Sequence, residues 1–360
     1  MNRFAPLAGE RLIRPTDPQI QYTGRIDDEN PEAPVFHFVC SGLRLRLAGR
    51  VLRLCVTNIR NCWENRLGIL VDGVQTAVLL PESGDAVIDL SHLLHEGVND
   101  VLIFKRQDSC HAFVFHGLMV ADDAELLDVP QLPERRIEVY GDSVSAGEVS
   151  EAEDYCGQVD PEHNGQYSNG WLSYAWQTAR LLNAQIHDIA QGGISLQDGT
   201  GYFNAPDYLG MLSCWDKVAY NPFLGPQKPW DFSRYTPHVV VVAIGQNDAH
   251  PVNFMQDDYD GEQARQWRDD YRRLVELIRG KYPIAHIILS TTILGHARQW
   301  DDAIDEVCEA LRQTDERVHH FLYRQNGCGT PGHIRGSEAA GMARELAAYI
   351  ETLPDVWANG

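Results

Sequence analysis

Four short segments of the chain carry residue types that together could cleave an ester. Residues 141–143 (GDS) supply a serine hydroxyl, residues 192–193 a glycine turn, and residues 245–248 (GQND) a carboxamide, while His333 lies in a Gly/Pro-rich loop. A serine hydroxyl is a weak nucleophile until a base removes its proton, and histidine suits that task because its pKa lies near neutral pH. Because each segment alone is typical of a turn, the prediction rests on their occurring together.

The residues of these segments divide into a nucleophile, a base and oxyanion donors. We predict that Ser143 attacks the ester carbonyl and that His333 takes its proton and later returns it. The oxyanion that forms needs preorganised donors, and we assign the N–H of Ser143, the N–H of Gly193 and the amide of Asn247 to that role. Gly192 is the alternative to Gly193, because the register of AQGGIS is open. Other histidines compete with His333, which is preferred because a loop presents it just before the last predicted helix. The competitors are His250 and His296 after predicted strands, and His319 and His320 within a strand-like run.

The second half of the chain alternates between strand and helix patterns. The predicted strands are residues 135–141, 184–193, 238–245, 285–293 and 317–323, and the predicted helices are residues 171–184, 265–279, 301–313 and 337–353. Such alternation indicates a parallel α/β sheet, in which ligands bind at the carboxyl ends of the strands. The serine, the glycine turn and the asparagine each follow a different predicted strand, so we expect them at one edge of the sheet.

The first half has a different pattern, with period two. In LRLRLAGRVLRL, leucines at 43, 45 and 47 alternate with arginines, and short β-rich runs separated by turn residues continue to about residue 125. This alternation is typical of antiparallel sheets with one buried face, so we predict a jelly-roll-like β-sandwich over residues 1–127. Two prolines mark a linker at residues 128–135, and the catalytic domain is predicted over residues 136–360.

Composition limits the partners that the protein can have. The formal net charge is −21, which disfavours nucleic acid and anionic membrane surfaces because both attract basic patches. The histidines and acidic residues show no metal-binding spacing, and the glycines no nucleotide-binding pattern, so we predict no metal and no cofactor. No signal-peptide pattern is visible, and we expect a cytoplasmic protein, with a secreted protein whose signal has been removed as the alternative. The oligomeric state is not indicated.

These residues resemble the four sequence blocks of the SGNH, or GDSL-type, hydrolases. Within that superfamily the chain is similar to the two-domain acetyl esterases of carbohydrate esterase family two, which place a small β-sandwich before the hydrolase domain. Residues 22–38 (YTGRIDDENPEAPVFHF) and 41–49 (SGLRLRLAG) resemble the N-terminal opening of that family, and residues 327–328 and 342–343 follow its order near the C-terminus. The resemblance covers nearly the whole chain and implies a flavodoxin-like catalytic domain with a parallel five-stranded sheet.

The loop before His333 departs from the superfamily pattern. The superfamily places an aspartate three residues before the histidine, where this chain has Thr330, and GCGTPG contains no carboxylate. In a catalytic triad the acid orients the imidazole and stabilises its charged form. Some members of the esterase family resemble a Ser–His dyad in which a backbone carbonyl replaces the acid, so we predict that the carbonyl of Pro331 accepts a hydrogen bond from the ring of His333. The alternative is a carboxylate from a remote loop, with residues 248–250 and 301–302 as candidates.

The resemblance implies a serine esterase that removes O-acetyl groups from xylo-, manno- or gluco-oligosaccharides through an acetyl-enzyme on Ser143. We predict Asp142, Trp215 and Trp230 as substrate contacts, although aromatic residues in the long segment 197–236 could instead form its own core. Two other functions stay open. A thioesterase or lipase-like hydrolase would need an apolar groove, of which the sequence shows no tract, and a non-catalytic carbohydrate-binding protein would not need the intact serine and histidine.

Overall fold

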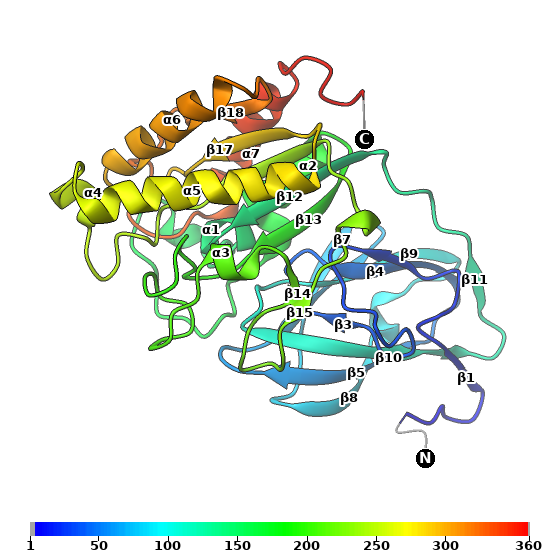
Figure 1. Cartoon of the computed structure of the whole chain (residues 1–360). Coiled ribbons are helices and arrows are strands. Elements are labelled where there is room, and N and C mark those ends of the chain that lie inside the picture. Colours follow the sequence, from blue (N-terminus) through cyan, green and yellow to red (C-terminus); the bar gives the residue numbers. More distant parts are fainter. Residues whose placement is uncertain (1–3, 359–360) are drawn as a thin grey trace. The chain divides into compact units, whose positions relative to one another are not determined.

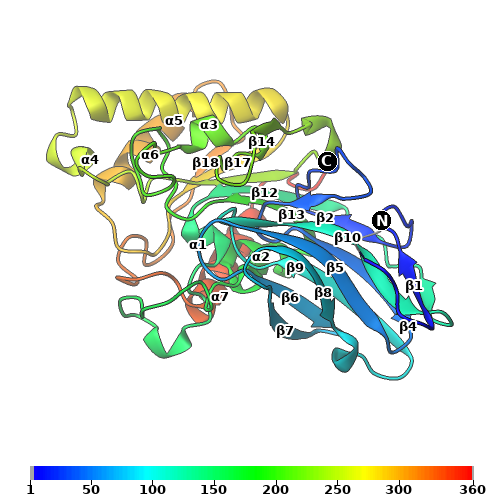
Figure 2. The same ribbon diagram turned by 90° about the horizontal axis from the view of Figure 1, so that it is seen from below.

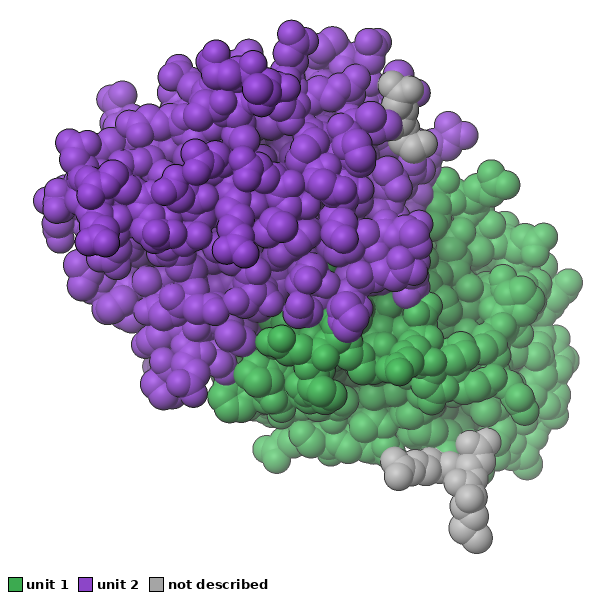
Figure 3. Space-filling view, viewed as in Figure 1, with its two compact units in different colours: residues 1–132, 164–166, 218–228 green, residues 133–163, 167–217, 229–360 purple. Residues whose placement is uncertain are grey.

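The computed structural model of the protein describes residues 4–358, which form two compact units (Figure 1; Figure 3 colours them separately). Unit 1 contains the chain up to Leu132 with residues 164–166 and 218–228, and unit 2 contains the remainder. The sequence indicated a division at 128–135 but not that two later segments would join unit 1. These segments are held by hydrogen bonds, such as the one that the side chain of Asn221 donates to the carbonyl of Ser109 at 2.5 Å.

Unit 1 is a sandwich of two antiparallel sheets, as predicted. One sheet has the order β1-β10-β5-β8, with β3 also paired to β10. Its strands are β1 (Glu10–Ile13), β3 (Val35–Phe36), β5 (Leu52–Arg60), β8 (Gly84–Asp89) and β10 (His111–Ala121). The other sheet has the order β11-β4-β9-β6-β7, with β2 paired to β4. Its strands are β2 (Gln21–Thr23), β4 (Gly42–Ala48), β6 (Arg66–Val71), β7 (Val74–Leu79), β9 (Val98–Lys105) and β11 (Glu125–Leu127), and the short helix η1 (Ser91–Leu93) precedes β9.

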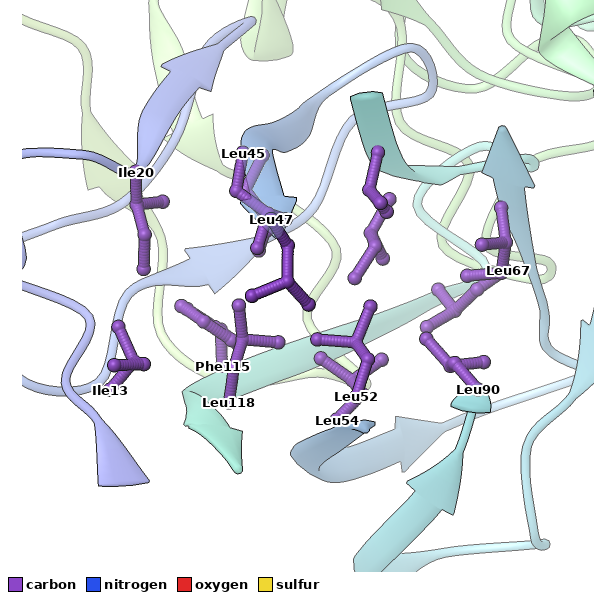
Figure 4. Close-up of a cluster of buried hydrophobic side chains, with 14 of the residues drawn as sticks. Ile13, Ile20, Leu45, Leu47, Leu52, Leu54, Leu67, Leu90, Phe115 and Leu118 are labelled. Carbon is purple, nitrogen blue, oxygen red and sulfur yellow. The ribbon is translucent and has the colours of Figure 1, made fainter. Parts of the chain in front are cut away.

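The core of the sandwich follows from the period-two pattern. In β4 the leucines at 43, 45 and 47 are buried, while Arg44 and Arg46 between them are partly exposed. These leucines contact apolar side chains of the opposite sheet, including Leu54 and Phe115, in one continuous cluster (Figure 4). Because successive side chains of a strand point to opposite faces, this alternation buries one face of each sheet.

Unit 2 contains the predicted parallel five-stranded sheet. Its order is β13-β12-β16-β17-β18, which is the flavodoxin-like arrangement. The strands are β12 (Arg135–Gly141), β13 (Ala184–Ala190), β16 (Val239–Ala243), β17 (His286–Ser290) and β18 (Val318–His320). Every residue of β16 is buried, as expected for a central strand covered on both faces.

Helices cover both faces of this sheet. Figure 2 shows α5 on one face and α2 with α7 on the other. The helices are α1 (Ser143–Ala146), α2 (Tyr174–Leu181), α3 (Met211–Cys214), α4 (Phe254–Asp257), α5 (Glu262–Lys281), α6 (Gln299–Arg312) and α7 (Gly336–Ile350). The 3₁₀ turns are η2 (Glu153–Tyr155), η3 (Gly170–Leu172) and η4 (Phe232–Arg234), and a small two-stranded sheet joins β14 (Lys217–Ala219) to β15 (Lys228–Pro229).

The amphipathic pattern accounts for α5, the longest helix of the described chain. The predicted apolar stripe is buried along its length, from Trp267 through Tyr271 and Leu274 to Ile278. The helix continues one residue past Gly280, which the sequence had indicated as its end. Over residues 4–358, no helix combines the length and the apolar character that crossing a membrane requires.

Truncating a buried residue of the central sheet should destabilise unit 2. Ile288 lies in β17 with no exposed surface, so we expect Ile288→Ala to lower the free energy of unfolding by about 2–5 kcal/mol, because it leaves a cavity. The matched control is Ile284→Ala, at a position with 44% of its surface exposed, which should change it by less than about 0.5 kcal/mol. Urea unfolding followed by tryptophan fluorescence measures both, and equal losses would contradict the burial of Ile288.

Candidate active site

The carboxyl ends of four neighbouring strands lie in one row of the parallel sheet. Ala190 pairs with Gly141, Gly141 with Ala243, and Ala243 with Ser290. The predicted glycine turn follows Ala190, the predicted serine follows Gly141, and the predicted asparagine follows Ala243. The register of the sheet therefore brings residues that are distant in the sequence to one edge.

Ser143 lies on a tight turn between β12 and α1. Gly141 has no room for a side chain, because a Cβ there would lie 2.5 Å from the Cβ of Ser145. The carboxylate of Asp142 caps α1 by accepting a hydrogen bond from the N–H of Val144 at 2.9 Å. The turn thus places Ser143 at the first position of a helix, where backbone N–H groups have no partner within the helix.

The serine meets the predicted histidine, and the histidine meets an aspartate that we did not predict. Nε2 of His333 lies 2.8 Å from Oγ of Ser143, and Nδ1 of the same ring lies 2.5 Å from Oδ2 of Asp160. With Asp160 ionised, Nδ1 carries a proton and donates a hydrogen bond to the carboxylate. Nε2 of the neutral ring is then an acceptor for the serine hydroxyl. This is the arrangement of a Ser–His–Asp triad.

The expectation of a dyad completed by the carbonyl of Pro331 is wrong, because Nδ1 of His333 pairs with Asp160 instead. The alternative that we had left open, a carboxylate from a remote loop, is confirmed, but neither candidate supplies it. Asp248 is buried and accepts hydrogen bonds from Trp267 and from the backbone of Leu196. Residue 301 pairs with His296, and residue 302 with Arg298.

Asp160 is held on its second oxygen by two further donors. Oδ1 accepts a hydrogen bond from the backbone N–H of His333 and another from Nη1 of Arg335, both at 2.9 Å. Arg335 is fully buried and also donates to the carbonyl of Ala152 at 3.1 Å. A Cβ at Gly332 would lie 2.7 Å from the same Oδ1, so glycine lets the loop approach the carboxylate. The signal that the sequence offered for this acid was thus a Gly-His-x-Arg segment, not a motif around Asp160.

The charges around the ring change the pKa values of both partners. Burial by itself would lower the pKa of His333, but the nearby carboxylates of Glu148 and Asp160 outweigh it and raise that pKa to about 9. Burial would also raise the pKa of Asp160, but hydrogen bonds and charge from His333 and Arg335 hold it well below its usual range. Asp160 is therefore ionised throughout the neutral range, and protonated His333 is stabilised.

Two of the three oxyanion donors that we predicted, Gly193 and Asn247, belong to loops that are tied together. The amide Nδ2 of Asn247 donates to the carbonyl of Ile194 at 3.0 Å and to Oδ2 of Asp142 at 3.3 Å. Gly193, directly before Ile194, has a positive φ of 74°, a conformation that glycine adopts without strain. Its carbonyl accepts a hydrogen bond from the N–H of Tyr202 at 2.8 Å. These contacts fix the glycine turn against the asparagine, while the assignment of their N–H groups to an oxyanion stays a prediction.

Asp142 does not lie where a substrate could reach it, contrary to our expectation. Only 1% of its surface is exposed. Besides the N–H of Val144, its carboxylate accepts hydrogen bonds from Nε2 of Gln246 at 2.7 Å and from Asn247. It therefore joins the serine turn to the asparagine loop. Its side chain positions the site instead of binding substrate.

Comparison with known proteins agrees with this geometry. Residues 139–325, slightly more than half of the chain, match the family described as GDSL-like lipase/acylhydrolase. The chain belongs to the GDSL-like lipase/acylhydrolase family. Residues 22–130 match the family described as carbohydrate esterase 2 N-terminal, so the predicted combination of the two domains is confirmed.

Relatives of this GDSL-like hydrolase include curated esterases. The cellulase/esterase CelE of Acetivibrio thermocellus is 30% identical over 346 residues, which are 93% of this chain but only 39% of CelE. The acetylxylan esterase / glucomannan deacetylase of Cellvibrio japonicus is 25% identical over 362 residues, covering 98% of this chain and 94% of that protein. A family two carbohydrate esterase from Clostridium thermocellum, solved in complex with cellohexaose, is 26% identical, with a TM-score of 0.77 over 92% of this chain and 98% of that one. Family and relatives identify unit 2 as a carboxylic ester hydrolase.

The other histidines of this GDSL-like hydrolase have different partners. His296 lies near the same edge, but its Nε2 contacts Asp301 and its Nδ1 contacts the carbonyl of Leu294 at 2.7 Å. Both ring nitrogens are therefore engaged, one by its own loop and the other by α6. Nδ1 of His250 contacts the carbonyl of Gly201. Among the candidates, His333 is the one that reaches Ser143.

The two tryptophans that we expected to bind substrate are buried. Trp215 packs on Phe232 with ring centroids 5.3 Å apart, and Trp230 packs on His187 with centroids 5.7 Å apart. Neither ring is exposed enough to offer a face to a sugar, so the expectation is wrong for both. The alternative, that rings of this segment form its own core, holds for Trp215, whereas Trp230 packs on His187 of β13.

A different aromatic residue of the same segment has the exposure that a sugar platform needs. Tyr202 is 58% exposed and stacks on His250 with ring centroids 4.1 Å apart. Its backbone N–H is the donor that contacts the carbonyl of Gly193. The ring therefore belongs to the loop next to the predicted oxyanion donors. Sequence alone did not separate Tyr202 from its buried neighbours, because the segment has no clear periodicity.

Removing the charge of Asp160 should impair the triad while leaving its shape intact. We expect Asp160→Asn to lower kcat for p-nitrophenyl acetate by about 10³–10⁴-fold, because the amide favours the wrong tautomer of His333 and cannot stabilise its charged form. Steady-state kinetics with circular dichroism as a folding check measures this. The matched control is Asp154→Asn, in the preceding turn η2 and exposed, which should retain activity. Wild-type activity in Asp160→Asn would show that a dyad suffices.

Proposed function

We propose that the protein is a serine esterase that removes O-acetyl groups from carbohydrate hydroxyls through an acetyl-enzyme on Ser143. The observation that carries this proposal is the chain of contacts from Oγ of Ser143 to Nε2 of His333 and from Nδ1 of His333 to Asp160. It unites a nucleophile, a base within hydrogen-bond distance and an acid that orients the base.

In the first half of the proposed reaction, the proton of the Ser143 hydroxyl moves to Nε2 of His333 while Oγ forms a bond to the acetyl carbon. The carbonyl oxygen becomes an oxyanion, which accepts hydrogen bonds from the N–H groups of Ser143 and Gly193 and from the amide of Asn247. The tetrahedral intermediate then collapses, the bond to the sugar oxygen breaks, and His333 returns the proton to that oxygen. The sugar leaves with a free hydroxyl.

In the second half, water takes the position that the sugar hydroxyl has left. His333 removes a proton from the water, whose oxygen bonds to the acetyl carbon of the acyl-enzyme. The same donors stabilise the second oxyanion, and the proton goes to Oγ of Ser143 as acetate leaves. Asp160 keeps its negative charge throughout and stabilises the imidazolium that forms twice in each cycle.

Carbohydrate is the proposed substrate class for two reasons. The relatives described above include an acetylxylan esterase / glucomannan deacetylase and a family two esterase solved with cellohexaose. In this chain, the exposed ring of Tyr202 next to the Gly193 turn offers an apolar face, on which the C–H groups of a sugar ring can pack. Xylo-, manno- and gluco-oligosaccharides with O-acetyl groups are the substrates to test.

A comparison of acyl chain lengths tests the acetyl-esterase proposal. Wild-type protein should hydrolyse p-nitrophenyl acetate faster than p-nitrophenyl octanoate, and Ser143→Ala should lower kcat by roughly 10⁵–10⁶-fold, because the nucleophile is lost. Acetate release from acetylated xylan or glucomannan gives the same comparison on sugars. Faster turnover of octanoate would favour a lipase-like hydrolase, and inactivity on every ester with retained sugar binding would favour a carbohydrate-binding protein.

Truncation of the exposed tyrosine tests the sugar platform. Tyr202→Ala should raise KM for an acetylated oligosaccharide about 3- to 10-fold, the loss expected for one aromatic contact of roughly 0.5–1.5 kcal/mol. Turnover of p-nitrophenyl acetate, which has no sugar ring, should change little. Phe223→Ala is the matched control, since Phe223 is 60% exposed but belongs to unit 1. An unchanged KM for the oligosaccharide would exclude Tyr202 from the binding site.

A further inference from the structure

A second carboxylate lies beside the catalytic imidazole, on the side opposite Asp160. Oε2 of Glu148 is 3.9 Å from Nε2 of His333, and the side chain of Glu148 is 21% exposed. Nε2 is the nitrogen that contacts Ser143. This separation is too long for a direct hydrogen bond, but at about 4 Å an opposite charge interacts strongly when the solvent is partly excluded.

The backbone places Glu148 there through one turn of helix. After Ser143, α1 ends at Ala146 and is capped by Gly147, which has a positive φ of 74° and donates its N–H to the carbonyl of Val144. A Cβ at Gly147 would lie 2.5 Å from the carbonyl oxygen of Asn169, so only glycine fits. The N–H of Glu148 then donates to the carbonyl of Ser143 at 2.9 Å. The carboxylate is thereby tied to the residue that carries the nucleophile.

We propose that Glu148 is a positioning residue of the active site, which stabilises the protonated form of His333 from the side where Ser143 and the leaving alcohol bind. The proposal rests on the role of His333 as the general base of the esterase proposed above. Glu148 acts through space, whereas Asp160 acts through a hydrogen bond to the other nitrogen. Because Nε2 must be free to accept the serine proton, a carboxylate on this side can help only if it stays too far away to replace Ser143.

Other charged groups around the ring do not duplicate this position. Asp160 and Arg335 lie on the Nδ1 side, where they bond to each other. The carboxylate of Asp142 acts on His333 more weakly than either Glu148 or Asp160. His163, on the loop after Asp160, is a cationic neighbour when protonated, but its own pKa is lowered by burial and by His333. Glu148 is thus the acidic group next to Nε2 among the residues found to act on this ring.

The stabilised imidazolium has opposite effects at the two ends of the pH range. In the resting enzyme the carboxylate of Glu148 favours protonated His333, which cannot accept the serine proton, so activity at low pH falls. During the reaction the same carboxylate stabilises the imidazolium that forms when Oγ of Ser143 bonds to the acyl carbon, so the rate on the alkaline plateau rises. The pKa of His333, raised to about 9 with Glu148 as the leading favourable charge, agrees with this balance.

Replacing Glu148 by glutamine should therefore make two pH profiles cross. In Glu148→Gln, we expect the acid limb of kcat/KM for p-nitrophenyl acetate to move about one pH unit lower, as expected for the loss of a partly solvated charge at this distance. The alkaline plateau should fall about 3- to 10-fold, so that the variant is faster than wild type at low pH and slower at high pH. Rates of spontaneous ester hydrolysis are subtracted at each pH.

Two further variants separate electrostatics from damage to the loop. Glu162→Gln makes the same chemical change at an exposed position of the segment that follows, and its profile should match that of wild type. Glu148→Asp keeps the charge on a shorter side chain, and its acid limb should lie between those of wild type and Glu148→Gln. A structural role for Glu148 would lower activity at every pH without moving the limb, and that outcome would overturn the proposal.

A second measurement needs no assumption about the substrate. Phenylmethanesulfonyl fluoride reacts with an activated serine, whose oxygen bonds to sulfur as fluoride leaves and the proton passes to His333. The pH dependence of its inactivation rate should shift in Glu148→Gln as the acid limb does. If wild-type protein is inert on acetyl esters but this shift is present, the acetyl-esterase proposal fails and the role of Glu148 stands. If acetyl esters are cleaved and neither profile shifts, the role of Glu148 fails alone.

Discussion

Three donors converge on the carboxylate of Asp160: the ring of His333, the backbone N–H of the same residue, and the guanidinium of Arg335. An exposed aspartate at the end of a mobile side chain would orient a histidine poorly, since any hydrogen bond to it must compete with water. Here one oxygen is occupied by the loop and by a buried arginine, so the other is aimed at Nδ1. The orientation of the base, and with it the contact to Ser143, follows from this constraint.

A second buried carboxylate performs the equivalent task on the other side of the serine. Asp142 accepts hydrogen bonds from the N–H of Val144 and from the side chains of Gln246 and Asn247. Gln246 in turn accepts a hydrogen bond from the hydroxyl of Thr292. One acidic group therefore connects the loops that follow three neighbouring strands. A buried carboxylate without hydrogen bonds would destabilise the fold. The hydrogen bonds to Asp142 therefore keep its three donors in place as well as the carboxylate itself.

The electrostatics of the site reflect competition between burial and charge. Burial by itself would favour neutral His333, but the carboxylates on its two sides reverse that preference and raise its pKa. The same comparison distinguishes Asp160 from Asp248, an acidic residue of the asparagine loop whose carboxylate accepts hydrogen bonds from Trp267 and from the backbone of Leu196. It has no cationic partner among the groups that act on it, and burial raises its pKa to about 6. An orienting acid must stay ionised, and the hydrogen bond and charge of His333, together with the ion pair to Arg335, make that possible for Asp160.

Local sequence pattern was sufficient for the parts of this protein that depend on neighbouring residues. The alternating leucines of β4, the apolar run of β16 and the buried stripe of α5 each follow from the period of the side chains along one element. The placement of Ser143, Asn247 and His333 could be predicted because each follows an element at the carboxyl edge, and because GDS and GQND resemble motifs of a known family. Tertiary structure alone decided the identity of the acid, since Asp160 reaches His333 from a loop without periodicity or motif. It also decided which aromatic rings are buried: Trp215 and Trp230 share their segment and residue class with Tyr202, and only packing in three dimensions separates the core residues from the exposed one.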